Sequence, residues 1–184
     1  MPGGSGDGSV RAWIALGGNL GDRAAILASA VERLRACGVT VRRLSHAYET
    51  RPEGGAAEPP YLNAVAELET TLPPEALLRT LQGIEEALGR PRPHLTGPRT
   101  CDLDLLSYDD LVTETPELVL PHPRLHRRGF VLVPLCELNV HWRHPGTGLA
   151  GGELLAGLSL APGEVRLHGP LPLEEALIAG PSGR

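Results

Sequence analysis

The chain has 184 residues, 41% of them hydrophobic and 21% charged, and a net charge of −5. Its length suits one domain, its composition is that of a soluble globular protein, and its negative charge argues against a general nucleic-acid binder. All 17 basic residues are arginine. Because a Walker A loop, a protein kinase and a pyridoxal phosphate enzyme each require a lysine, these three classes are excluded.

The three cysteines form no CxxC pair, which argues against a disulfide framework or a zinc ribbon and fits a reducing cytoplasm. No apolar run approaches the roughly 20 residues that span a bilayer, so no membrane association is expected. Residues 1–9 are rich in glycine and lack the apolar segment of a signal peptide. We expect a disordered leader over residues 1–9, one domain over 10–160 and an extension of unknown role over 161–184.

The first half of the chain alternates between strand and helix patterns. Residues 10–16 predict a buried strand that ends in the glycine-rich turn 17–21. Asp22 is placed to cap a helix that Gly38 ends, and residues 40–48 predict a second strand.

Residues 61–71 predict a third strand, whose apolar positions alternate between two faces. Leu62, Ala64, Ala66 and Leu68 share one face, and Tyr61, Asn63 and Val65 share the other. Pro73 and Pro74 open a second helix that Gly89 ends. Its apolar stripe leaves Gln82 and Glu85 together on the other side.

Residues 101–108 predict a fourth strand, which completes a β-α-β-β-α-β order. This order predicts an α+β fold with a ferredoxin-like core, in which helices pack on one face of an antiparallel sheet. Beyond it, we expect extra C-terminal elements. Residues 130–138 favour a short helix broken by Pro134, and residues 172–179 favour a terminal helix.

Asp102 and Asp104 are the strongest chemical feature of the sequence. Residues two apart on a strand point the same way, so both carboxylates face one side while Leu103 and Leu105 face the core. Two carboxylates so close repel each other unless a cation lies between them. Oxygen ligands with room for water and phosphate suit Mg²⁺. Taken alone, such a pair is more often two ordinary solvated acidic residues on the exposed edge of a strand.

Arginines flank this pair along the chain: Arg90, Arg92 and Arg99 before it, and Arg124, Arg127 and Arg128 after it. One guanidinium group can donate two hydrogen bonds to the oxygens of a phosphate, so a site for a metal-bound triphosphate is one interpretation of these arginines. Surface ion pairs are the other, and the charge pattern does not separate the two. His122 lies between two prolines and is thereby restricted. Zinc is disfavoured, because His122 and His126 are spaced as on a helix that Pro123 makes unfavourable.

Several segments occur together in one order: 14–22 (IALGGNLGD), 48–50 (YET), 60–63 (PYLN), 97–106 (GPRTCDLDLL) and 121–130 (PHPRLHRRGF). This ordered set resembles the motifs of the 6-hydroxymethyl-7,8-dihydropterin pyrophosphokinases over about residues 11–138. The resemblance implies transfer of pyrophosphate from MgATP to the hydroxymethyl group of the pterin, with release of AMP, in folate biosynthesis.

The resemblance also implies roles for individual residues. Asp102 and Asp104 would hold two Mg²⁺ ions, and Arg90 and Arg92 would join them in catalysis. The expected nucleotide contacts are Gln82, Glu85, Arg90, Arg92, Arg99, Leu105, His122 and Arg128. The expected pterin contacts are Thr50, Pro52, Tyr61, Asn63 and Phe130, with the ring stacked between Tyr61 and Phe130.

We expect ATP and the pterin as the binding partners, no nucleic acid or membrane, and a monomer. Two other classes stay open from the residues. One is a non-catalytic anion-binding domain of the same fold, which would gain nothing from two metal-binding carboxylates. The other is a magnesium phosphohydrolase, against which the order of elements argues.

Overall fold

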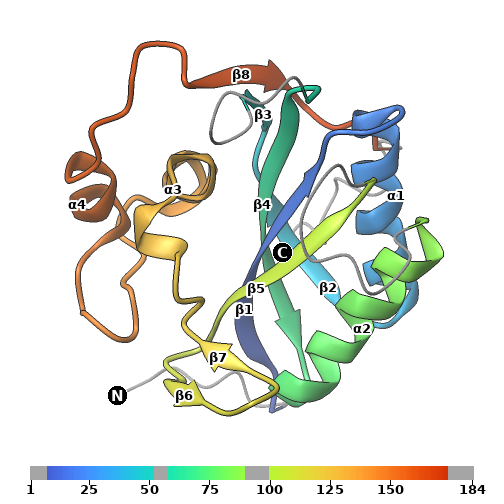
Figure 1. Ribbon diagram of the computed structural model, residues 1–184. Coiled ribbons are helices and arrows are strands. Elements are labelled where there is room, and N and C mark those ends of the chain that lie inside the picture. Colours follow the sequence, from blue (N-terminus) through green and yellow to red (C-terminus); the bar gives the residue numbers. More distant parts are fainter. Residues whose placement is uncertain (1–7, 52–57, 90–99, 174–184) are drawn as a thin grey trace, which may run out of the picture.

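The computed structural model describes residues 8–51, 58–89 and 100–173. Within them, a six-stranded sheet lies between two layers of helices (Figure 1). The sheet strands are β1 (Val10–Gly18), β2 (Thr40–Leu44), β3 (Ala47–Thr50), β4 (Tyr61–Thr70), β5 (Asp102–Tyr108) and β8 (Val165–Gly169). The remaining elements are α1 (Arg23–Ala36), α2 (Pro74–Ala87), α3 (Gly129–Asn139), α4 (Gly151–Ala156), the 3-10 turn η1 (Leu125–Arg127) and a small hairpin of β6 (Thr113–Glu114) and β7 (Val119–Leu120).

Every strand pair in the sheet is antiparallel, in the order β5-β1-β4-β3-β8, and β2 pairs with β4 beside β3. The central pair, β1 and β4, stays in register from Val10 opposite Thr70 to Gly18 opposite Leu62. The expected antiparallel sheet with helices is therefore confirmed. Residues 165–169, which fall in the segment expected to be an extension of unknown role, supply the edge strand β8.

Side-chain alternation divides the buried apolar residues into two cores, one on each side of the sheet. On one side, Leu62, Ala64, Ala66 and Leu68 of β4 pack with buried residues of α1 and α2, which confirms the predicted face. On the other, Val65 of β4 packs with residues of α3 and α4. Helices therefore cover both faces, rather than the one face expected (Figure 1).

Local signals set the ends of the first two helices as predicted. The side chain of Asp22 accepts a hydrogen bond from the Ala25 backbone N–H at 3.1 Å, which caps α1. Gly38 and Gly89 follow α1 and α2 with φ of 79° and 89°, a region that favours glycine. Pro74 is the first residue of α2, where its missing N–H costs nothing.

The single strand predicted over residues 40–48 is wrong, because Ser45 and His46 divide it into β2 and β3. The Ser45 N–H donates to the Val65 carbonyl at 2.9 Å, and the Ser45 hydroxyl accepts from the Val65 N–H at 2.9 Å. A side-chain oxygen thus takes the place of a main-chain carbonyl in the ladder and interrupts the strand.

The predicted break at Pro134 is also wrong, since α3 continues through it. A proline inside a helix costs about 3 kcal/mol in lost hydrogen bonding and ring contacts. Val131, Leu132 and Leu135 on either side of it are buried against the sheet. Because burial of each contributes about 1.5–3 kcal/mol, packing outweighs the local cost.

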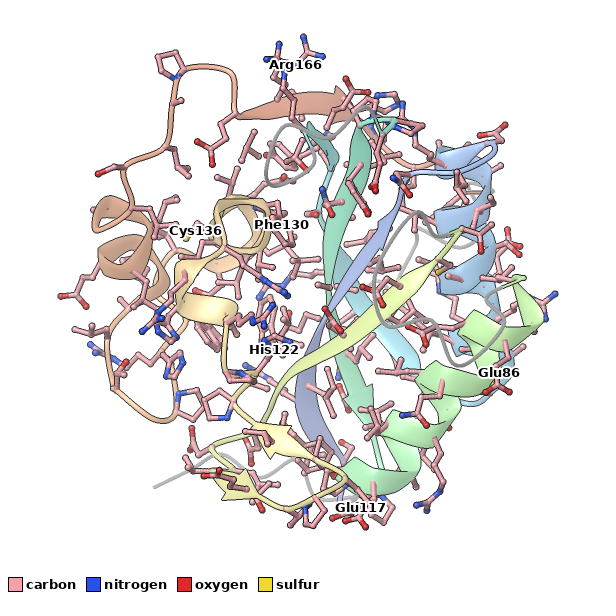
Figure 2. All side chains as sticks on the ribbon, in the orientation of Figure 1. Glu86, Glu117, His122, Phe130, Cys136 and Arg166 are labelled. Carbon is pink, nitrogen blue, oxygen red and sulfur yellow. The ribbon has the colours of Figure 1, made fainter. Side chains whose placement is uncertain are left out.

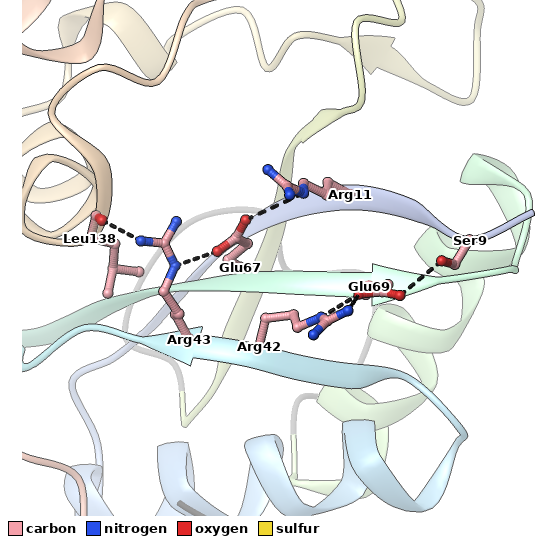
Figure 3. A network of polar contacts seen from close by, with 7 residues as sticks. All are labelled: Ser9, Arg11, Arg42, Arg43, Glu67, Glu69 and Leu138. Atoms are coloured by element: carbon pink, nitrogen blue, oxygen red, sulfur yellow. Dashed lines mark hydrogen bonds and ion pairs between the residues drawn. The ribbon is translucent and has the colours of Figure 1, made fainter. Parts of the chain in front are cut away.

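Away from the site, two glutamates of β4 join β4 to the neighbouring strands (Figure 3). Glu67, 5% exposed, pairs with Arg43 of β2 and with Arg11 of β1. Glu69 pairs with Arg42 and accepts a hydrogen bond from the Ser9 hydroxyl at 2.8 Å. This network fastens the end of β4 that lies farthest from Tyr61.

Some expectations lie outside the described residues: the leader up to residue 7, Pro52, Arg90, Arg92 and Arg99, and most of the helix expected over residues 172–179. Among the residues that are described, no helix has the length and apolar character needed to cross a membrane.

Candidate functional site

Asp102 and Asp104 lie on the same side of β5, as predicted, and this is the side on which α3 lies. Leu103 and Leu105 are each 4% exposed in the core on the opposite side, so alternation turns both carboxylates away from that core. The neighbouring positions on β1 are small: Gly17 lies opposite Asp102 and Ala15 opposite Asp104. The sheet surface beside the two carboxylates is therefore not filled by β1 side chains.

The donor set fits a hard cation that keeps water. Within the described ranges, no group of three or more His, Cys, Asp or Glu side chains is arranged to hold a metal ion. A closed zinc site of four protein ligands is therefore not formed by these residues. Two carboxylates with open positions match the needs of Mg²⁺, which completes its shell with water and substrate phosphates.

Arg128 brings a positive charge to the same place. It is the residue that precedes the first turn of α3, and its Nη1 lies 3.6 Å from Oδ2 of Asp104. Its guanidinium also lies 5.4 Å from the centre of the Phe130 ring. The side chain is 19% exposed. The other two arginines of the same cluster, Arg124 and Arg127, are exposed, so the structure singles out Arg128.

His122 is held beside the aspartates by its own backbone. Its N–H donates to the carbonyl of Leu106 in β5 at 2.8 Å. Its Nδ1 accepts from the Arg124 N–H at 3.1 Å, so Nε2 carries the proton of the neutral ring. Burial, then the charges of Arg128 and Arg124, lower the pKa of His122 to about 4, against the opposing effect of Asp102. At neutral pH, His122 is therefore an uncharged hydrogen-bond donor.

A pH-dependent stability difference follows from this lowered pKa. Between pH 6.5 and 4 the unfolded chain binds a proton at His122 that the folded chain does not, so folding stability falls as the pH falls. Relative to His122→Gln, the wild type should lose about 1–2 kcal/mol of unfolding free energy between pH 7 and pH 5. Urea unfolding of both proteins at the two pH values measures this. An unchanged difference would contradict the lowered pKa.

The expected pterin contacts on β4 lie on the same face, two strands from the aspartates of β5. Thr50 of β3 lies opposite Tyr61 of β4, and Asn63 donates from Nδ2 to the Thr50 hydroxyl at 2.9 Å. Asn63 and Thr50 are only 7% and 8% exposed, so this pair is a fixed part of the sheet surface. Phe130, in the first turn of α3, lies on the same side (Figure 2).

One row of residues links the two groups. Tyr48 of β3, Asn63 of β4, Gly17 of β1 and Asp102 of β5 are consecutive partners across four strands. With neighbouring strands about 4.8 Å apart, the backbones of Asn63 and Asp102 are about 10 Å apart. A Cβ at Gly17 would lie 3.0 Å from Oδ1 of Asn63, so the glycine gives the amide its space. The sequence had indicated only a tight turn for this glycine.

Two residues expected to contact the nucleotide, Glu85 of α2 and Leu105 of β5, have buried side chains. Glu85 is not on the solvent side of the helix stripe: it is 6% exposed, and its Oε1 accepts from the Leu103 N–H at 2.7 Å. Glu85 thereby accepts the hydrogen bond of a backbone N–H on the outer edge of β5, at the residue between the two aspartates. Gln82 is half-buried on the same helix. Leu105 has its side chain in the core, so only its backbone can face a ligand.

Because N–H groups two residues apart on a strand point the same way, the Leu105 N–H also points to the open edge of β5. Strand alternation in the sequence could have predicted that the Leu103 and Leu105 N–H groups point the same way. Which edge of β5 is left without a neighbouring strand depends on the strand order of the sheet. The arginines Arg90, Arg92 and Arg99 and Pro52 lie outside the described residues.

Comparison with known proteins agrees with this geometry. The chain matches the family model of 7,8-dihydro-6-hydroxymethylpterin-pyrophosphokinase over residues 13–140. It is 46% identical over 128 residues to the 2-amino-4-hydroxy-6-hydroxymethyldihydropteridine pyrophosphokinase of Bacillus subtilis, with 69% of this chain and 77% of that protein covered. It is 36% identical over 181 residues to the protein of the same name from Synechocystis, with 86% and 92% covered.

Among solved structures, the chain resembles the Plasmodium falciparum HPPK-DHPS with a TM-score of 0.66 at 14% identity, which is a likeness of fold. The match covers 80% of this chain and 45% of that longer one. The family match covers most of the present sequence, including both aspartates, His122 and Arg128. This chain therefore belongs to the 7,8-dihydro-6-hydroxymethylpterin-pyrophosphokinase family.

Proposed function

We propose that this chain transfers the pyrophosphoryl group of MgATP to the hydroxymethyl group of 6-hydroxymethyl-7,8-dihydropterin, a step of folate biosynthesis. The hydroxymethyl oxygen loses its proton to solvent and forms a bond to the β-phosphorus, the bond from that phosphorus to the α-phosphate oxygen breaks, and AMP leaves. The observation that carries the proposal is the row from Asn63 through Gly17 to Asp102. It supports a flat ring over β4 and β1 with its substituent beside the carboxylates of β5.

Asp102 and Asp104 would hold magnesium, with two ions expected alongside ATP. Bound there, the metal neutralises phosphate charge and orients the phosphates, which suits a reaction that depends on positioning and charge more than on covalent help. Arg128, 3.6 Å from Asp104, would contribute positive charge to the same phosphates. His122 would donate from neutral Nε2, a contact that adds no charge of its own. Arg90, Arg92 and Arg99 are expected to complete the phosphate contacts.

The pterin would be held by polar groups at its edge and aromatic rings on its faces. Asn63 offers an amide whose orientation its bond to Thr50 fixes, which suits the donor and acceptor pattern of a pterin edge. Tyr61 comes from the sheet and Phe130 from α3, which supports stacking on the two faces of the ring. Pro52 is proposed beside them. Gln82, Glu85 and the backbone of Leu105 would border the nucleotide.

The strand order β5-β1-β4, with β2 and β3 on the far side of β4, supports a ferredoxin-like core. We propose that residues 10–160 form the catalytic domain, that β8 extends its sheet at the β3 edge, and that the protein acts as a monomer in the cytoplasm.

The product nucleotide tests the reaction. The protein is incubated with Mg²⁺, ATP and reduced hydroxymethyl-pterin, and the nucleotides are separated by chromatography. AMP that appears only when the pterin is present is the expected result. ADP with free phosphate, or no turnover by folded protein, would contradict the proposal and favour the non-catalytic anion-binding domain instead.

A further inference from the structure

Glu49 joins three segments that are far apart in the sequence. In β3, its Oε2 lies 3.0 Å from Nη2 of Arg23, the first residue of α1. Its Oε1 lies 2.6 Å from Nη2 of Arg166 in β8. The side chains of Glu49 and Arg23 are 19% and 23% exposed, so their ion pair is partly shielded from water. Arg166 is 65% exposed and lies at the surface of the molecule (Figure 2).

The Arg23 guanidinium also holds the backbone that precedes Tyr61. Its Nη1 donates to the Pro60 carbonyl at 2.6 Å. Beside it, Nδ2 of Asn19, a residue only 2% exposed, donates to the Pro59 carbonyl at 3.3 Å. Glu49 directly precedes Thr50. The same cluster therefore fixes the chain next to Thr50 and next to Tyr61, the two ends of the connection over residues 51–60.

Strand alternation shows how this cluster can act. Glu49 pairs with Leu62 in the register of β3 and β4, and Leu62 belongs to the core under α1 and α2. Thr50 and Tyr61 point to the opposite face, toward α3. Glu49 and Arg23 are therefore behind the sheet from any ligand beside Asn63, and they can influence it only through the backbone.

Arginines from both β8 and α1 determine the ionisation of Glu49. The contact with Arg166, followed by that with Arg23, holds the pKa of Glu49 below its ordinary value. The carboxylate therefore stays ionised at neutral pH and keeps both guanidinium groups. β8 lies beyond the segment matched by the family model, which ends at residue 140.

We infer that the C-terminal strand β8 takes part in pterin binding, because Arg166 steadies Glu49 and Arg23, which position the backbone of Thr50 and Tyr61. The inference rests on the proposed function, since it assigns positioning residues to the pterin half of that site. The ATP half is carried by β5 and the segment before α3, and β1 and β4 separate β5 from β3 in the sheet. Loss of the cluster therefore weakens pterin binding selectively.

The test compares three substitutions with a matched control. Arg23→Gln and Glu49→Gln should raise the KM for the pterin about 5- to 10-fold, and Arg166→Gln about 3-fold, with kcat and the KM for ATP changed less than about twofold. Adding Arg166→Gln to Glu49→Gln should cause no further loss, because both act through one carboxylate. Arg42→Gln is the control: it breaks a similar ion pair between Arg42 of β2 and Glu69, which lies about 27 Å along β4 from Tyr61.

Pterin affinity is also measured without turnover, by calorimetry in the presence of Mg²⁺ and a non-hydrolysable ATP analogue. Equal loss of pterin and ATP affinity, or an Arg166→Gln protein that binds pterin like the wild type, would overturn the inference. Wild-type protein that binds pterin but forms no AMP would contradict only the proposed reaction, and the variant affinities would still decide the role of β8. A wild type that binds no pterin would overturn both.

Discussion

Replacing Asp102 or Asp104 with asparagine should lower AMP formation by about a thousand-fold or more, because a bound divalent ion contributes several kcal/mol to the stabilisation of transferring phosphates. Asparagine has nearly the same shape as aspartate but carries no charge, so it removes the electrostatic attraction for Mg²⁺ while preserving the strand. The double variant should be little worse than either single one, since groups that act as a unit lose their effect together.

Steady-state AMP formation across a range of Mg²⁺ concentrations measures this effect. Partial recovery at high Mg²⁺ is expected for the single variants, because one carboxylate remains. The control is Asp110→Asn, which changes an exposed aspartate in the turn just after β5. Turnover within threefold of the wild type, with the same Mg²⁺ dependence, would show that the two carboxylates do not hold the metal.

The second large effect is expected at Arg128, whose replacement with alanine should lower kcat about a hundred- to thousand-fold. The guanidinium of Arg128 lies within ion-pair distance of Asp104 and also lies against the ring of Phe130. Arg128→Lys retains the charge but loses the planar fork and the stacking surface, so it should recover only a small part of the rate.

A neighbouring residue provides the control for this prediction. Arg127 is exposed, and its Nε donates to His126 at 3.1 Å, away from the aspartates. Arg127→Ala should therefore keep near-normal turnover. Full activity of Arg128→Lys would mean that a point charge is enough, and equal losses at Arg127 and Arg128 would mean that general positive charge acts in place of a specific contact.

These predictions differ in what they report about the site. The aspartate substitutions test metal binding, and the Arg128 substitutions test whether its positive charge stabilises the phosphates. The His122 substitution tests whether an uncharged hydrogen-bond donor lies among these groups. Burial and the neighbouring arginines lower the pKa of His122 to about 4. A pH–rate profile flat between pH 6 and 8 would agree with a ring that is already neutral there.

Much of the site could be predicted from local sequence. A strand places residues two apart on one face, so the sequence alone determined that Asp102 and Asp104 point together and that Leu103 and Leu105 are buried. Asp22, Gly38 and Gly89 mark helix ends through their own hydrogen bonds and backbone preferences. The absence of lysine excluded whole classes of phosphate-binding sites. The ordered motifs pointed to the family, which the comparisons confirm.

The features that the sequence did not predict depend on contacts between distant segments. Pro134 disfavours a helix locally, but the burial of its neighbours against the sheet keeps the helix intact. Ser45 divides a strand because its hydroxyl meets Val65 of another strand. Glu85 looks like a surface residue of a helix until β5 presents an unpaired N–H to it.

Only the tertiary structure decided that Asn63, Gly17 and Asp102 form one row. The period of a strand is encoded in consecutive residues, whereas its register depends on which partners it meets and on how both faces are buried. The same reason hid the contact between Arg166 and Glu49, which are 117 residues apart. The sequence determined which side chains share a face, and packing of the sheet determined which faces and rows meet to form the site.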